Sequence, residues 1–189
     1  MPTTEAGWGA AVADVAPFSL LRHILDTYLL RGTAVEFGVG AGVSTRMIAA
    51  HMPIVGFDSF QGLPEDWRPE YRAGSMASLQ PWGTTNAHIV AGWFADTLPE
   101  FDFAAITPIG LVHVDCDLYS STVTALQHVG PHLQPGCIVV FDELLNYDDG
   151  PGASYRDHEL KAWNEYVNQS GIGWAPLAHC GEAAAVVLQ

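Results

Sequence analysis

Five short, mainly apolar runs, each followed by a glycine or an aspartate, constrain the fold of this chain more than any other feature. Their length and their content of β-branched and aromatic residues are typical of strands. Apolar runs without alternation indicate strands buried on both faces, as in a parallel sheet. We expect these strands at residues 33–37, 54–57, 87–91, 110–114 and 137–141.

Amphipathic helical segments alternate with these strands. We expect helices over residues 18–29, 44–51, 121–132 and 156–169, and a closing hairpin from 174–178 and 183–188. In a chain of 189 residues this alternation predicts one α/β domain, residues 1–189, with an open, mostly parallel sheet, helices on both faces and an N-terminal helical segment over 1–32.

Residues 60–86 form a connection too long to be a simple turn, and it carries Trp67, Tyr71 and Trp82. A long loop rich in aromatic residues is typical of a lid or a substrate-facing loop. A short helix with a wandering loop is the alternative, and the sequence leaves both open.

The first strand runs into a turn with Gly38, Gly40 and Gly42, and a helix follows from Ser44. Glycines there let the backbone approach a ligand, and the helix start offers free N–H groups. The glycines lack the G-x-G-x-x-G spacing of dinucleotide-binding proteins. Glu36 within the motif suits a cationic amino group better than a pyrophosphate. The pattern therefore favours S-adenosylmethionine over NAD, with a purely structural turn as the alternative.

Asp58 ends the second strand, twenty residues after Gly38. A carboxylate there accepts hydrogen bonds from ribose hydroxyls. An Asx turn or a helix N-cap is the alternative, and both can hold together. Trp93 follows the third strand and either flanks an adenine or packs in the core. The predicted cofactor site contains Glu36, Gly38, Gly40, Ser44, Asp58, Ser59 and Trp93.

Acidic residues follow the fourth and fifth strands: Asp115 and Asp117 after one, Asp142 and Glu143 after the other. Adjacent strand ends lie about 4.8 Å apart, so these carboxylates converge at one edge of the sheet. Clustered carboxylates repel unless a cation joins them, and Mg²⁺ prefers such oxygen ligands. Helix caps and exposed loop acids are the alternative.

Charge and cysteine content narrow the partners and the compartment. Seven Lys and Arg against 21 Asp and Glu give a net charge of −14, which repels nucleic acid and anionic membranes. No apolar run has the length of a membrane span, the N-terminus lacks a basic signal-peptide start, and three dispersed cysteines suit a reducing compartment. We expect a cytoplasmic protein whose partner is neutral, cationic, or an anion met through a bound metal.

Taken together, the motifs resemble the macrocin O-methyltransferase family of class I S-adenosylmethionine-dependent methyltransferases. The residues that carry the resemblance lie in segments 35–42, 56–65, 92–94, 113–122 and 140–143. The resemblance implies a seven-stranded Rossmann-like sheet with an antiparallel last strand. It also implies methylation of a natural-product hydroxyl, such as that of a sugar, and a magnesium site of Asp115, Asp142 and Glu143.

Two departures from the family pattern stand out. The second residue of the acidic pair is commonly aspartate in the family and is Glu143 here. About thirty residues precede the first strand, fewer than in the well-known sugar methyltransferases, so we expect a more open pocket or one completed in a homodimer.

The implied reaction is attack of a small-molecule hydroxyl on the methyl group of S-adenosylmethionine. Candidates to take the hydroxyl proton are Asp115, His113 and His158, although His113 lies in a buried strand and is better interpreted as a core residue. The alternatives are a metal-dependent glycosyltransferase, in which Asp115-Cys116-Asp117 is a DxD motif, a NAD-dependent oxidoreductase, and a non-catalytic S-adenosylmethionine-binding protein.

Overall fold

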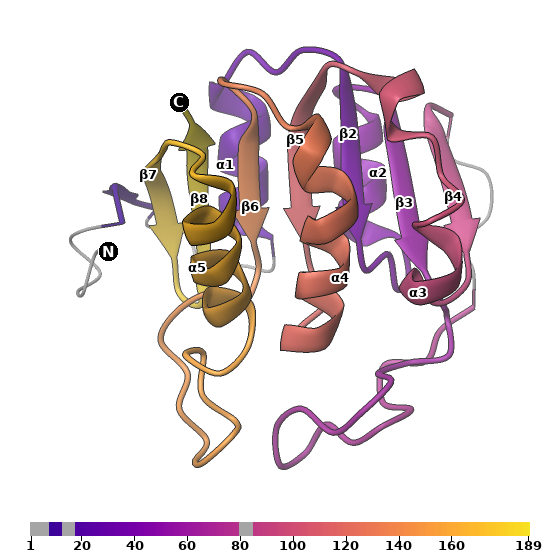
Figure 1. Ribbon diagram of the computed structural model, residues 1–189, viewed down its shortest axis with the longest axis vertical. Helices are drawn as coiled ribbons and strands as arrows, with labels where there is room; N and C mark the ends of the chain where they lie inside the picture. Colours follow the sequence, from indigo (N-terminus) through magenta and orange to yellow (C-terminus); the bar gives the residue numbers. More distant parts are fainter. Residues whose placement is uncertain (1–7, 13–17, 80–84) are drawn as a thin grey trace.

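A computed structural model describes residues 8–12, 18–79 and 85–189, and a single twisted sheet forms its centre (Figure 1). All five expected strands and the closing hairpin are present. The strands are β1 (Ala10–Ala11), β2 (Thr33–Phe37), β3 (Ile54–Asp58), β4 (Ala87–Ala91), β5 (Ile109–Val114), β6 (Ile138–Phe141), β7 (Trp174–Cys180) and β8 (Ala183–Leu188).

The sheet has the order β1-β7-β8-β6-β5-β2-β3-β4. Strand β8 is antiparallel to both of its neighbours, and the other pairs are parallel. The mostly parallel α/β sheet with an antiparallel last strand is thus confirmed. The expected count of seven strands is corrected to eight, because the two-residue β1 adds to the edge of β7. Two alanines carry no strand pattern, so the sequence could not indicate β1.

Helices cover both faces of the sheet, as expected (Figure 1). They are α1 (Ser19–Thr27), α2 (Val43–Ala49), α3 (Phe94–Thr97), α4 (Tyr119–Val129) and α5 (Glu159–Ser170). Among the described residues, no helix is both long enough and apolar enough to cross a membrane.

Two hydrophobic cores lie on the two faces. Side chains of α1 and α2, such as Ile24 and Ile48, pack with Leu111 of β5 on one face. The next residue of β5, Val112, points to the other face and packs with α4 and α5, including the fully buried Trp163. This alternation explains why the central strands are continuously apolar.

The parallel strands β2, β3, β5 and β6 all end at one edge of the sheet, the lower edge in Figure 1. Two long loops, residues 59–79 and 142–158, extend beyond this edge. Arg68 of the first loop forms ion pairs with Asp149 of the second loop and with Glu182 in the β7–β8 turn. Its guanidinium also stacks 4.2 Å from the ring centre of Tyr147. The two loops are therefore fastened to each other and to the sheet.

The described part of the predicted loop, residues 60–79, contains no helix, so the alternative of a short helix is wrong there. Trp67 does not face a substrate, because its side chain is 5% exposed and packs with Leu63, Leu118 and Tyr147. Tyr71 is 38% exposed. Trp82 lies outside the described residues.

Candidate active site

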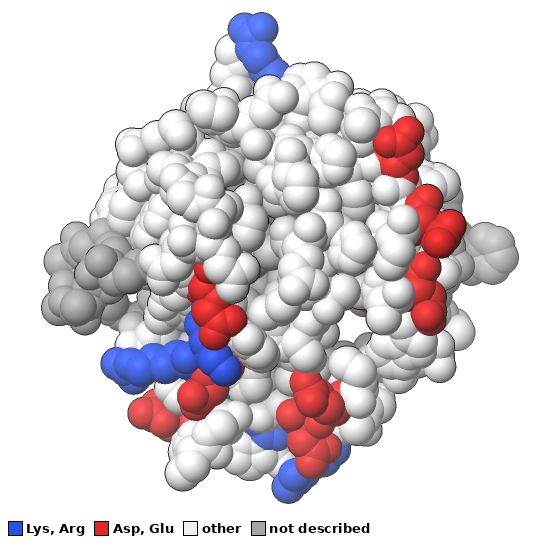
Figure 2. All heavy atoms as spheres, viewed as in Figure 1, with Lys and Arg blue, Asp and Glu red and all other residues white. Residues whose placement is uncertain are grey.

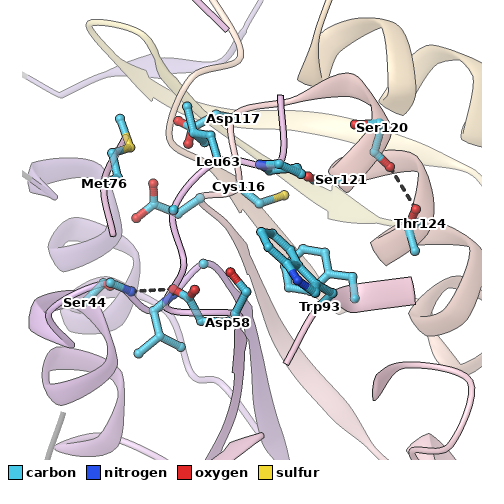
Figure 3. A pocket seen from close by; sticks show the side chains of 18 of the residues that line it. Ser44, Asp58, Leu63, Met76, Trp93, Cys116, Asp117, Ser120, Ser121 and Thr124 are labelled. Atoms are coloured by element: carbon cyan, nitrogen blue, oxygen red, sulfur yellow. Dashed lines mark hydrogen bonds between the residues drawn. The ribbon is translucent and has the colours of Figure 1, made fainter. Parts of the chain in front are cut away.

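A cavity of about 540 Å³ opens where the parallel strands end (Figure 3). Its size is typical of small-molecule sites. Six of the residues predicted for a cofactor site line it, namely Gly38, Gly40, Ser44, Asp58, Ser59 and Trp93. Leu63 and Met76 of the 60–79 loop also line it, which agrees with a substrate loop. Asp58 and Asp117 lie toward opposite ends of the cavity, with Met76 and Trp93 on its sides (Figure 3).

Asp58 holds the glycine turn in place. Its Oδ2 accepts hydrogen bonds from the backbone N–H groups of Val39 and Gly40, at 2.8 and 2.7 Å. Its Oδ1 accepts one from the N–H of Phe60, at 2.7 Å. The expected Asx turn is therefore present, and the carboxylate still lines the cavity, where an oxygen can accept a further hydrogen bond.

The glycines of the turn have different roles. Gly38 has φ +93°, and a Cβ there would stand 1.8 Å from the carbonyl oxygen of Asp115, so the turn is pressed against the end of β5. Gly40 has φ +50°, and a Cβ there would meet no atom within 4 Å. Because Gly40 lines the cavity, its missing side chain leaves room in which a bulky cofactor can lie against the backbone.

Glu36 does not line the cavity, which corrects its predicted contact with a cofactor amino group. The side chain is fully buried, Thr45 Oγ1 donates a hydrogen bond to it, and His113 Nδ1 lies 3.1 Å from its Oε1. Both carboxylate oxygens are thus occupied in the interior, one by α2 and one by β5. Glu36 therefore holds the helix that follows the turn through its hydrogen bond with Thr45.

His113 is fully buried, as expected for a core histidine, and connects Glu36 with the acidic residues of the cavity. Its Nε2 lies 3.5 Å from Asp142 Oδ1. Burial alone lowers the pKa of His113, but its hydrogen bonds with Asp142 and Glu36 outweigh burial and raise the pKa well above the ordinary value. A proton on His113 therefore balances the two carboxylates.

The acidic residues after β5 and β6 converge, as the sequence predicts, in two groups. His113, Asp115 and Asp142 each bring one ligand atom within 4.8 Å of the others, and so do Asp115, Asp117 and Glu143. Asp115 belongs to both groups. The predicted metal ligands Asp115, Asp142 and Glu143 are thus split, with Asp142 in the first group and Glu143 in the second. Asp117 also belongs to the second group.

These carboxyl groups match a divalent cation in chemistry and in charge. Burial, and then the neighbouring carboxylates, raise the pKa of Asp115 and Glu143 well above their ordinary values. Among the described residues Glu143 Oε2 is buried without a hydrogen-bond partner. Glu159 of α5 is also fully buried, and its Oε2 accepts a hydrogen bond from the N–H of Glu143 at 3.3 Å. Such a crowded set of oxygen atoms favours a hard cation such as Mg²⁺.

Asp117, which the sequence analysis placed among the converging carboxylates but not among the predicted metal ligands or proton acceptors, belongs to the site. It lines the cavity, is 5% exposed and has φ +63°, a backbone conformation that is rare outside glycine. Burial, followed by repulsion from Asp142, raises the pKa of Asp117 to about 7. The signal in the sequence was the second acid of Asp115-Cys116-Asp117.

His158 is not positioned as a proton acceptor, which corrects its predicted role. Its ring is 7% exposed, and its Nδ1 accepts a hydrogen bond from the N–H of Tyr119 at 3.4 Å. Its Nε2 lies 3.1 Å from the carbonyl oxygen of Gly152, to which it donates. Both ring nitrogens are engaged by the backbone, and the ring does not line the cavity. His158 instead joins the start of α4 to the 142–158 loop.

Comparison with known proteins gives two curated relatives. An 8-demethyl-8-(2,3-dimethoxy-alpha-L-rhamnosyl)-tetracenomycin-C 4'-O-methyltransferase of Streptomyces olivaceus is 29% identical over 154 residues, which cover 65% of this chain and 58% of that protein. The mycinamicin III 3''-O-methyltransferase of Micromonospora griseorubida is 25% identical over 175 residues, which cover 80% of this chain and 67% of the relative. The chain thus spans less than two thirds of the first relative.

Among solved structures, the calicheamicin methyltransferase CalS11 superposes with a TM-score of 0.65 at 26% identity, over 89% of this chain and 76% of CalS11. CalS11 is also described as a TDP-rhamnose 3'-O-methyltransferase. The profile of a family described as "Methyltransferase domain" matches residues 35–144, more than half of the chain. The chain therefore belongs to this methyltransferase domain family.

Proposed function

We propose that this protein is an S-adenosylmethionine-dependent O-methyltransferase that acts on a hydroxyl group of a small molecule, a sugar or another natural-product hydroxyl. The observation that carries the proposal is one cavity with a glycine turn and Asp58 toward one end and the acidic residues toward the other. The two curated relatives are O-methyltransferases by name, one of a rhamnosyl-tetracenomycin and the other of mycinamicin III, and the motifs resemble the macrocin family.

The residues around the turn suit an adenosine cofactor. Asp58 offers an acceptor for ribose hydroxyls, Gly40 leaves space against the backbone, and Trp93 offers an aromatic surface for an adenine ring. S-Adenosylmethionine supplies an electrophilic methyl group on sulfur when bound. The protein has to hold the acceptor hydroxyl in line with it, which is a large part of the rate gain in such transfers.

The acidic residues suit a divalent cation, which would polarise the acceptor hydroxyl. Asp115 is the centre of this proposed site because its carboxylate lies close to Asp142 in one group and to Asp117 and Glu143 in the other. The protonated His113 has no lone pair for a metal and is not counted as a ligand. A buried Glu143 Oε2 without a hydrogen-bond partner supports a ligand role for this longer side chain.

Asp117 is the proposed acceptor of the hydroxyl proton. It lines the cavity with Asp115, and its carboxylate is placed there to take the hydroxyl proton. His113 is held between Glu36 and Asp142 and positions the acidic residues without touching the acceptor.

A methyl-transfer assay with Mg²⁺ and a panel of sugar and aromatic natural-product hydroxyls tests the proposal. Asp117→Asn should lower kcat by about 100-fold or more, since general bases contribute factors of this order, while the affinity for S-adenosylmethionine stays unchanged. Glu70→Gln is the matched control, because Glu70 is an exposed acid of the 60–79 loop that does not line the cavity. Release of sugar from a nucleotide sugar, without methyl transfer, would contradict the proposal.

A further inference from the structure

Glu159 is a buried acidic residue to which the proposed mechanism gives no role. It is the first residue of α5, and its side chain is fully buried. Acidic side chains usually lie at the surface, where water solvates them, as on the face that α4 and α5 cover (Figure 2). Among the residues that the structure describes, no Lys, Arg or His forms an ion pair with Glu159. The burial of this carboxyl group therefore needs an explanation.

The two carboxyl oxygens of Glu159 have different surroundings. Oε2 accepts a hydrogen bond from the backbone N–H of Glu143, at 3.3 Å. Oε1 is buried and has no hydrogen-bond partner among the described residues, and the same holds for Oε2 of Glu143. Native proteins bury few polar atoms without a partner, and an ordered water or an ion often explains those that occur. Two such oxygens, on two residues in contact, point to a ligand that is a cation or a hydrogen-bond donor.

The packing of α5 places Glu159 beside the end of β6. Trp163 lies one helical turn after Glu159 and is also fully buried, so the two side chains share the inner face of α5. The ring of Trp163 packs edge-on against Phe141, with the ring centres 5.4 Å apart. Phe141 is the last residue of β6, and Asp142 and Glu143 follow it directly. The register of α5 therefore holds Glu159 against the acidic pair.

Glu159 lies behind the candidate metal ligands and not among them. It belongs to neither of the two groups whose ligand atoms lie within 4.8 Å of one another. Burial, and then repulsion from Asp117, Asp115 and Asp142, raise the pKa of Glu159 well above its ordinary value. Glu159 is thus near enough to interact with these acids, and its hydrogen bond goes to the backbone of the candidate ligand Glu143.

A purely structural role does not account for this arrangement. An acidic residue in the first turn of a helix interacts favourably with the helix dipole, but the gain is modest. Burial of a carboxyl group among other acids costs more than this gain. An apolar residue of similar size would pack at the start of α5 without that cost. A role of Glu159 toward a ligand of the site explains the carboxyl group better.

We infer that Glu159 is a positioning residue of the proposed cation site and that it acts through Glu143. The inference rests on the proposed function. Oε2 of Glu159 fixes the backbone of Glu143 at the end of β6, and Oε1 is available to accept a hydrogen bond from water that a divalent cation retains. Residues that hold the ligands of a metal in place are common, and their loss typically lowers metal affinity by about 10–100-fold.

Calorimetric titration of the full chain with Mg²⁺, in the presence of S-adenosylmethionine, tests the inference. Glu159→Met keeps the approximate volume of the side chain but removes both oxygens, and it should lower the Mg²⁺ affinity by about 10-fold or more. Glu159→Gln keeps an oxygen for the N–H of Glu143 and should recover a large part of that loss. The matched control is Glu165→Met on the same helix, because Glu165 accepts its hydrogen bond from the hydroxyl of Tyr119 and belongs to neither ligand group. This control should keep the wild-type Mg²⁺ affinity.

The Tm of the protein without Mg²⁺ separates positioning from packing. Glu159→Met should then unfold at or above the wild-type Tm, because an apolar residue in place of a buried ionisable one is often neutral or stabilising. Its rise in Tm on addition of Mg²⁺ should be smaller than that of the wild type. A lower Tm without Mg²⁺ together with an unchanged Mg²⁺ affinity would show a merely structural role and overturn the inference. Glu159→Leu takes the place of Glu159→Met if the latter does not fold.

The other outcomes separate the inference from the proposed function. An unchanged Mg²⁺ affinity of Glu159→Met, or an equal loss in the Met and Gln variants, would overturn the inference and leave the proposed methyl transfer standing. A wild-type protein that binds S-adenosylmethionine but not Mg²⁺ would overturn the proposed cation site, and the inference with it.

Discussion

His113 Nδ1 lies 3.1 Å from Glu36 Oε1, and both side chains are fully buried. The two residues face each other in the register of β5 and β2. Through the opposite ring nitrogen His113 reaches Asp142 at 3.5 Å. A buried polar chain thus connects the strand that carries the glycine turn to the acidic residues of the cavity.

Loss of the Glu36 carboxylate should destabilise the fold. Glu36→Ala leaves His113 with only one acidic partner in the interior, and removing one member of a buried pair costs about 3–5 kcal/mol. Glu36→Gln keeps hydrogen-bonding atoms and should cost less. Chemical denaturation measures both variants. Unchanged stability of Glu36→Ala together with lost cofactor affinity would return Glu36 to direct cofactor contact.

The two glycines of the turn should respond differently to a methyl group. Gly38→Ala places a Cβ 1.8 Å from the Asp115 carbonyl oxygen and should destabilise the fold strongly, measured as a lowered Tm. Gly40→Ala meets no protein atom within 4 Å and should cost only about 1–2 kcal/mol, for its positive φ alone. The added methyl group should instead weaken the binding of S-adenosylmethionine. Normal cofactor affinity of a folded Gly40→Ala variant would place the cofactor elsewhere.

Asp58→Ala should weaken S-adenosylmethionine binding by about 1–3 kcal/mol, because it removes a ribose acceptor and frees the turn N–H groups that it holds. Calorimetry measures the change. Asp26→Ala on α1 is the control, since Asp26 is an exposed partner of His51. Equal affinity of the two variants would remove Asp58 from the cofactor site.

Mg²⁺ should stabilise the protein more at high pH than at low pH. Burial and mutual repulsion raise the pKa of Asp115, Glu143 and Glu159 in the folded state. The stability that these groups give when protonated is present below about pH 4 and is lost as the pH rises through their folded-state pKa values. Mg²⁺ binds the ionised carboxylates, so its stabilising effect grows over the same range.

Thermal unfolding with and without Mg²⁺, at about pH 5.5 and about pH 8, measures how the stabilisation by Mg²⁺ depends on pH. The rise in Tm should be larger at the higher pH. Asp115→Asn should reduce the rise more than Asp142→Asn, because Asp115 belongs to both ligand groups. An equal rise in wild type and Asp115→Asn would contradict the metal site.

The strands, the glycine turn and the edge where the acidic residues meet follow from local sequence patterns. Apolar runs, turn residues and strand ends are encoded within a few residues, so Gly38, Asp58 and Asp115 were placed correctly in the cavity wall. The predicted homodimer and the cytoplasmic location stay predictions.

Errors arose where a role depends on contacts between distant segments. Glu36 was assigned to the cofactor because its burial against His113 depends on the register of β2 and β5, which one sequence does not show. His158 was assigned as a base because its hydrogen bond with the carbonyl oxygen of Gly152 exists only in the folded 142–158 loop. The sequence does not show this contact. Asp117 was expected among the converging carboxylates but was given no role of its own, because its place in the cavity wall depends on a positive φ that its residue type does not require.

Calorimetric titration of the purified chain with S-adenosylmethionine, in the presence of Mg²⁺, tests the central claim most directly. We predict binding of S-adenosylmethionine at micromolar strength and no heat with NAD, because the turn N–H groups that would hold a pyrophosphate are bound to Asp58. Binding of NAD, or no binding of S-adenosylmethionine, would contradict the assignment of this cavity to methyl transfer.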